Sequence, residues 1–190
     1  MRRVLTCIGA LLVLCGVANA QDERVMSFDF PAGHMIRMKL AAGGYVIRAT
    51  SEDNVSVRIS ADQANDLNKP WVKFTTDHGV GRLETKDATK VNVTIEVPAR
   101  SDLDIRLGYG EVSVKGIEGH KEVHMSAGEI NIEVGDPSAY RDVTARVRIG
   151  DVKARPFRVS KSGFFRSFKL TGSGQYGLRA TVGVGEINFL

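Results

Sequence analysis

Three groups of residues in this chain have types and spacings that could support chemistry. The first is HKEVH, in which His120 and His124 could ligate a metal ion. The zinc-protease motif places two histidines on one helical turn with Glu directly after the first, whereas here Lys121 follows and the segment has the alternation of a strand. Four residues of strand separate two side chains by about 13 Å, too far for one ion. We therefore expect surface histidines here.

The second group is the acidic residue that follows each of four recurring glycines. These residues are Glu111, Glu129, Asp151 and Glu186. Calcium needs about six to eight oxygens that converge on one point, usually from a D-x-D-x-D-G loop, and no such loop occurs in the sequence. We expect a solvated acidic face.

The third group is GSGQYG, Gly172–Gly177, which matches G-x-G-x-x-G. A dinucleotide site requires a helix directly after this motif, whereas a glycine-rich strand pattern follows here. The sequence thus predicts no catalytic residue, no cofactor and no metal site.

The most distinctive segment is RPFRVSKSGFFRSFKL, Arg155–Leu170, in which cations interleave with phenylalanines and no acid intervenes. One interpretation is a cap that covers the end of the fold and prevents pairing between sheet edges. The other is a contact surface for an anionic polymer, a lipid headgroup or a partner protein. The two can coexist. The candidate contact residues are Arg155, Phe157, Arg158, Lys161, Phe164, Phe165, Arg166, Phe168 and Lys169.

Residues 1–20 have the pattern of a secretory signal peptide. Arg2 and Arg3 precede an apolar run, and Ala18-Asn19-Ala20 is a small-residue cleavage site. Both cysteines lie inside this segment, so the mature chain is expected to form no disulfide and no thiolate metal site. Without Arg2 and Arg3 the 26 basic residues fall to 24 against 22 acidic ones, a formal net charge of +2. That balance excludes a general nucleic-acid-binding surface. We expect one domain over residues 21–190 and no membrane span after cleavage.

The elements that must position these residues are short strands. Apolar and polar residues alternate in MIRMKL (35–40), NVSVRI (54–59) and VNVTIEV (91–97). Such alternation, interrupted every 8–12 residues by Gly, Asn, Asp or Pro, is typical of half-buried strands. The sequence predicts an all-β protein.

A glycine phrase recurs at Gly110, Gly128, Gly150 and Gly185. The residues five and three before each glycine, and two and four after it, are apolar in every case, so we expect these positions to point inward and form the core. Self-similarity at intervals of about 20 residues is typical of solenoids. We therefore predict a single-domain right-handed parallel β-solenoid (β-helix) with rungs of about 18–22 residues and a glycine corner in each coil. The alternative is an antiparallel sandwich.

The run from Lys90 to Asp136 resembles the putative-adhesin family of bacterial envelope proteins. The resemblance rests on IEVP (95–98), GYGEV (108–112) and AGEI (127–130), with AAGGYVIRAT (41–50) and VGVGEINF (182–189) also fitting. It implies a right-handed parallel β-helix fold and lends no catalytic residues.

Together these observations predict a non-enzymatic, exported, adhesin-like protein of the periplasm or cell exterior, acting as a binding or scaffolding surface for an envelope polymer or protein. One alternative is a polysaccharide-acting β-helix enzyme. Another is a subunit that docks on an envelope partner through Arg155–Leu170.

Overall fold

The computed structural model describes residues 22–61, 66 and 71–190. The predicted signal peptide, residues 1–20, lies outside them. In the described part no helix is long and apolar enough to cross a membrane. The strands are β1 (Asp22–Asp29), β2 (Met35–Leu40), β3 (Gly43–Thr50), β4 (Asn54–Ala61), β5 (Trp71–Asp77), β6 (Val80–Lys86), β7 (Asn92–Pro98), β8 (Asp102–Lys115), β9 (Lys121–Ile132), β10 (Tyr140–Ala154), β11 (Val159–Thr171) and β12 (Tyr176–Phe189). Two 3-10 helices, η1 (Pro137–Ala139) and η2 (Arg155–Phe157), flank β10.

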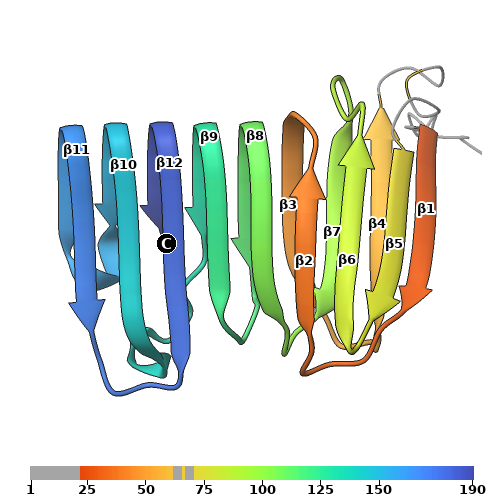
Figure 1. Cartoon of the computed structure of the whole chain (residues 1–190), viewed down its shortest axis with the longest axis horizontal. Coiled ribbons are helices and arrows are strands. Elements are labelled where there is room, and N and C mark those ends of the chain that lie inside the picture. The colour runs from red at the N-terminus through yellow and green to blue at the C-terminus, as the bar shows by residue number, and fades with distance from the viewer. Residues whose placement is uncertain (1–21, 62–65, 67–70) are drawn as a thin grey trace, which may run out of the picture.

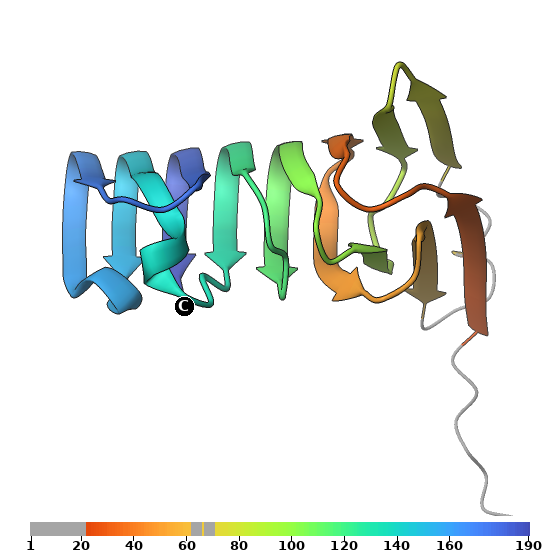
Figure 2. The same cartoon turned by 90° about the horizontal axis from the view of Figure 1, so that it is seen from below.

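The strands form one mixed sheet that folds over into two facing layers. Figure 1 shows β11, β10, β12, β9 and β8 side by side in that order, and Figure 2 shows these long strands curling over. The sheet branches at β8, whose first half pairs with β2 and whose second half pairs with β3. One layer continues through β2, β6 and β5, and the other through β3, β7, β4 and β1.

The all-β prediction is confirmed, but the predicted right-handed parallel β-solenoid is wrong. Neighbouring strands run antiparallel in the pairs β1–β4, β4–β7, β5–β6 and β10–β11. Moreover, β12 lies between β9 and β10, so the strands do not stack in chain order. A purely antiparallel sandwich does not describe the fold either, because β8, β9, β12 and β10 pair in parallel. Alternation fixes which side chains point inward, whereas a parallel or an antiparallel neighbour can satisfy the same backbone groups.

The predicted inward positions are nevertheless all in the core. In β8, Ile105 and Leu107 before the corner and Val112 and Val114 after it are at most 5% exposed, and their equivalents in β9, β10 and β12 are buried as well. These side chains belong to one hydrophobic cluster that extends through both layers. Since two apolar faces exclude water only when they cover each other, this burial holds the curled strands together.

The corner glycines are required by close approach of the backbones. Gly128 has a φ of +132°, and a Cβ placed on it would lie 1.8 Å from the carbonyl oxygen of Gly110 on the neighbouring strand. The same relation joins Gly110 to Gly43, Gly185 to Gly128 and Gly150 to Gly185. The glycine phrase therefore recurs because any side chain at these points would strike the next strand.

Candidate functional site

The cationic and aromatic segment forms η2 and the edge strand β11. Arg158 ends η2 in the left-handed conformation, with a φ of 56°, and β11 then runs antiparallel to β10. β11 is the last strand in the sheet order, so its other edge has no neighbour among the described residues. The predicted cap and the predicted contact surface therefore both lie on η2 and β11.

The four phenylalanines of this segment divide into two pairs. Phe168 is 7% exposed, and its ring centroid lies 5.7 Å from that of Phe157, which in turn lies 6.4 Å from that of Phe189. Phe164 and Phe165, by contrast, are 66% and 80% exposed. Phe157 and Phe168 thus cover the end of the core, and Phe164 and Phe165 are available for contact.

The cations of the segment all lie at the surface. Arg166 Nε donates to the Ser162 carbonyl oxygen at 2.6 Å, and Lys161 Nζ donates to the Ser167 carbonyl oxygen at 2.8 Å. The others are Arg155, Arg158 and Lys169, each exposed.

Two of these cations occupy core-facing register positions of β11. Arg166 pairs with the buried Val147 and Lys161 with the buried Val152, and opposed residues of antiparallel strands lie on the same face. Charges at inward positions of an edge strand discourage the addition of another strand. The core therefore ends at β11.

The backbone of β11 is irregular where Phe165 lies. Gly163 and Phe165 have φ values of 110° and 52°, although the register with β10 continues without a shift from Arg166 opposite Val147 to Phe164 opposite Ile149. A left-handed conformation is uncommon for a bulky residue. It brings two adjacent phenylalanines to the surface together.

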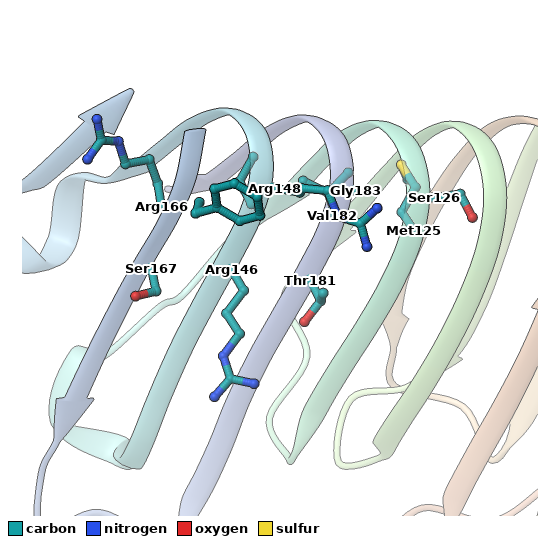
Figure 3. Close-up of a pocket in the computed structure, with 11 residues that line it drawn as sticks. Met125, Ser126, Arg146, Arg148, Arg166, Ser167, Thr181, Val182 and Gly183 are labelled. Carbon is teal, nitrogen blue, oxygen red and sulfur yellow. The ribbon is translucent and has the colours of Figure 1, made fainter. Parts of the chain in front are cut away.

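Beside Phe165 lies a groove of about 550 Å³ that crosses β9, β12, β10 and β11. Figure 3 shows Arg146 extended beside Thr181 and Arg148 directed over Val182 and Gly183, while the Arg166 guanidinium turns away. None of the described residues that line the groove is acidic. The sequence analysis did not identify this groove, because the lining residues come from four strands whose order only the structure gives.

An exposed apolar stripe runs across the strands between the position of Arg148 and the corner glycines. Its members are opposite one another in the strand register: Tyr109, Ala127, Val184, Ile149 and Phe164. Tyr109 and Phe164 at its ends are about two-thirds exposed, at 65% and 66%. Large apolar groups gathered on a surface mark interaction sites more often than isolated ones do.

The predicted acidic face forms one column beyond this stripe. Adjacent strands place Glu111 beside Glu129, Glu129 beside Glu186 and Glu186 beside Asp151. Polar side chains two residues further on bind three of the carboxylates. Asn131 donates to Glu111 at 3.2 Å, Asn188 to Glu129 at 3.0 Å and Lys153 to Glu186 at 2.6 Å. These contacts offset the repulsion between neighbouring carboxylates.

The two histidines are engaged separately. His124 is hydrogen-bonded to Glu122 Oε1 at 3.0 Å, and His120 Nδ1 accepts from the Gly177 amide at 2.8 Å. The hydrogen bond from His124, and then the Arg179 guanidinium, hold the pKa of Glu122 below its usual range. Among the described residues, no cluster of three or more His, Cys, Asp or Glu could hold a metal ion. Gly172–Gly177 connects β11 to β12, so a strand follows it as expected.

A second groove, of about 360 Å³, contains acids. Glu118, Glu133 and Asp136 line it together with Tyr140 and Tyr176. Asp136 is engaged in capping η1, since its side chain accepts from the Ser138 amide at 2.9 Å and from the Ser138 hydroxyl at 2.7 Å. Those bonds lower the pKa of Asp136, the reverse of what a general acid needs.

Comparison with known proteins identifies the class of fold. No protein-family model matches the chain, and no curated protein sequence matches it either. A solved structure, a putative cell adhesion protein from Clostridium sporogenes, is similar over 89% of this chain and 98% of its own, with 17% identity and a TM-score of 0.57. Putative adhesins from Parabacteroides merdae and Bacteroides fragilis align over 90% and 92% of this chain and 73% and 100% of their own, with identities of 13% and 10% and TM-scores of 0.38 and 0.34. The Clostridium sporogenes structure therefore confirms the resemblance at the level of the fold.

Proposed function

We propose that this protein is an exported, non-enzymatic, adhesin-like binding protein that contacts a polymer or protein of the cell envelope through the exposed face of β11. The observation that carries the proposal is the exposure of the adjacent Phe164 and Phe165 among cations, with no acid in the strand. A binding role agrees with the name of the Clostridium sporogenes protein, and export agrees with the signal-peptide pattern of residues 1–20.

The exposed phenylalanines offer apolar area that a bound partner would remove from water. Phe164 and Phe165 expose apolar area that Phe157 and Phe168, a few residues away, bury. A few residues carry most of the binding energy at protein interfaces, and phenylalanine and arginine are both enriched in the buried centre of such interfaces. The apolar stripe from Tyr109 to Phe164 enlarges the same surface.

Co-sedimentation of the mature chain with isolated envelope fragments tests the proposal. We expect the wild type to sediment and the double variant Phe164→Ser/Phe165→Ser to remain in the supernatant, with an unchanged melting temperature. Trp71→Ser is the matched control, because Trp71 is also an exposed aromatic, at 44%, but lies on β5 at the other end of the sheet (Figure 1). Equal sedimentation of the double variant and the wild type would refute the proposal.

Protease treatment of the fragments separates the two kinds of partner. Sedimentation that survives the treatment indicates a polymer, and sedimentation that is lost indicates a protein on which this chain docks as a subunit through Arg155–Leu170.

The rival function is a polysaccharide-acting enzyme, and the groove with Glu118 and Glu133 is the observation in its favour. Glycosidases use two carboxylates across the scissile bond. This alternative expects release of soluble sugars from envelope polysaccharide by the wild type and not by Glu133→Gln. Our proposal expects no release by either.

A further inference from the structure

Two arginines of the 550 Å³ groove, Arg146 and Arg148, differ from Arg37 and Arg179, which pair with carboxylates. Arg37 lies 3.9 Å from Asp104, and Arg179 lies 3.3 Å from Glu122. Arg146 and Arg148 form no such pair with any described residue, although both are exposed. Exposed arginines that lack a carboxylate partner are available to a ligand.

The strand order explains why these two arginines have no acidic neighbour. Parallel pairing with β12 places Thr181 beside Arg146, and antiparallel pairing with β11 places Ser167 on its other side. Gly183 forms the floor of the groove beside Arg148 and leaves it without a side chain. Only glycine fits there, because a Cβ on Gly183 would lie 2.4 Å from the Ser126 carbonyl oxygen. The groove therefore presents the guanidinium groups of Arg146 and Arg148, together with hydroxyls from Ser126, Ser167 and Thr181, around an open floor (Figure 3).

We propose that this groove binds phosphate groups carried by a linear polymer. An arginine donates two parallel hydrogen bonds to the two unbridged oxygens of a phosphate within a chain, and each of these oxygens can accept a further hydrogen bond from the hydroxyl of Thr181 or Ser167. Arginine suits phosphate recognition because its rigid fork of donors matches the phosphate geometry. Two such arginines without a carboxylate partner favour a ligand that carries more than one phosphate.

The size of the groove argues for a polymer over a single ion. It spans four adjacent strands, about 14 Å at the usual strand spacing, and its volume of about 550 Å³ far exceeds that of one phosphate. Arg146 and Arg148 are two residues apart on one strand, about 7 Å, so they can hold two different phosphates of one chain. Phe165 lies at the rim, where it can pack against the units that link them. This inference rests on the proposed function for the polymer and assigns its charged group.

Isothermal titration calorimetry of the mature chain with a short linear polyphosphate, and separately with inorganic phosphate, tests the inference. The decisive variant is Arg146→Gln/Arg148→Gln. The matched control is Lys73→Gln/Lys115→Gln, which removes the same charge from exposed positions on β5 and β8. We expect polyphosphate to bind wild type and control alike and to bind the arginine variant at least tenfold more weakly, while all melt at similar temperatures.

Three results would overturn the inference. The first is equal binding by the arginine variant and the wild type. The second is an equal loss in the lysine control, which would reduce the effect to net charge. The third is binding of inorganic phosphate as tight as that of polyphosphate, which would make the free ion the ligand. If envelope fragments still sediment with the wild type while polyphosphate fails to bind, the inference is wrong and the proposed function stands.

Discussion

Burial of Lys121 makes the stability of this fold depend on pH in a way that can be calculated. Its side chain is 2% exposed, and Nζ donates to the Tyr140 hydroxyl at 2.7 Å. The Tyr140 hydroxyl in turn donates to the Val134 carbonyl oxygen at 3.1 Å. Burial lowers the pKa of Lys121 from 10.5 to about 8, against the opposing charges of Glu118 and Asp102.

The direction in which the free energy of unfolding changes with pH depends on whether the folded or the unfolded chain holds the proton. Between about pH 8 and pH 10.5 the unfolded chain keeps the Lys121 proton and the folded chain releases it, so the free energy of unfolding rises with pH. One pKa unit corresponds to about 1.4 kcal/mol, which gives a rise of about 1.3 kcal/mol from pH 7 to pH 9. Burial also raises the pKa of Tyr140 from 10 to about 12, so above pH 10 this group removes stability as pH rises further.

Urea denaturation of wild type and Lys121→Met at pH 7, 8 and 9 measures the effect. Methionine has a similar length and no charge, so we expect it to fit the same space and to be the more stable side chain at pH 7. The difference in free energy of unfolding between the two proteins should shrink by about 1.3 kcal/mol by pH 9. Lys115→Met, at an exposed position, should show no such trend. A difference that stays constant from pH 7 to pH 9 would refute the reasoning.

The other predictions concern the corner, the cap and an ion pair. Gly110→Ala should destabilise the protein by about 3 kcal/mol or more in thermal or urea denaturation, because its Cβ would lie 1.9 Å from the Gly43 carbonyl oxygen. Gly108→Ala is the control and should cost little, because a Cβ there would have nothing within 4 Å. Equal destabilisation by the two variants would contradict the role of the corner glycine. Phe168→Ala should cost about 3–5 kcal/mol and Phe164→Ala less than about 0.5 kcal/mol, and a large loss at Phe164 would mean that the exposed pair also belongs to the cap. Hydrogen bonds from Arg48 and Ser56 lower the pKa of Glu96 in the folded protein. The ionised Glu96 therefore stabilises the fold above the pKa of the unfolded carboxyl, and this stabilisation is lost as pH falls through the lower folded pKa. The free energy of unfolding of Glu96→Gln should accordingly change less with pH in the acid range than that of the wild type.

The sequence was sufficient for the local features of this fold. Alternation identified Ile105, Leu107, Val112 and Val114 as inward-facing, and all are buried. The glycine phrase located the corners, because a position that excludes every side chain leaves a clear signal at Gly110 and its equivalents. The first feature depends on the residue and its neighbours along the chain, and the second requires glycine at the corner whichever strand lies beside it.

The candidate site was predicted only in part. The Arg155–Leu170 segment was recognised, but its composition could not separate the buried Phe168 from the exposed Phe164. That division arises from the register with β10 and the left-handed backbone at Phe165. The groove arginines belong to a strand whose neighbours, β12 and β11, both follow it in the sequence.

The sequence by itself determined which residues avoid water and where each strand must bend, because these follow from side-chain polarity and from the space that a Cβ needs. Only the tertiary structure decided which strands are neighbours and in which direction they run. The physical reason is that backbone amides and carbonyls are alike in every strand and accept parallel and antiparallel partners. The insertion of β12 between β9 and β10, and with it the pairing of Arg146 with Thr181, was therefore settled by how the whole core closes.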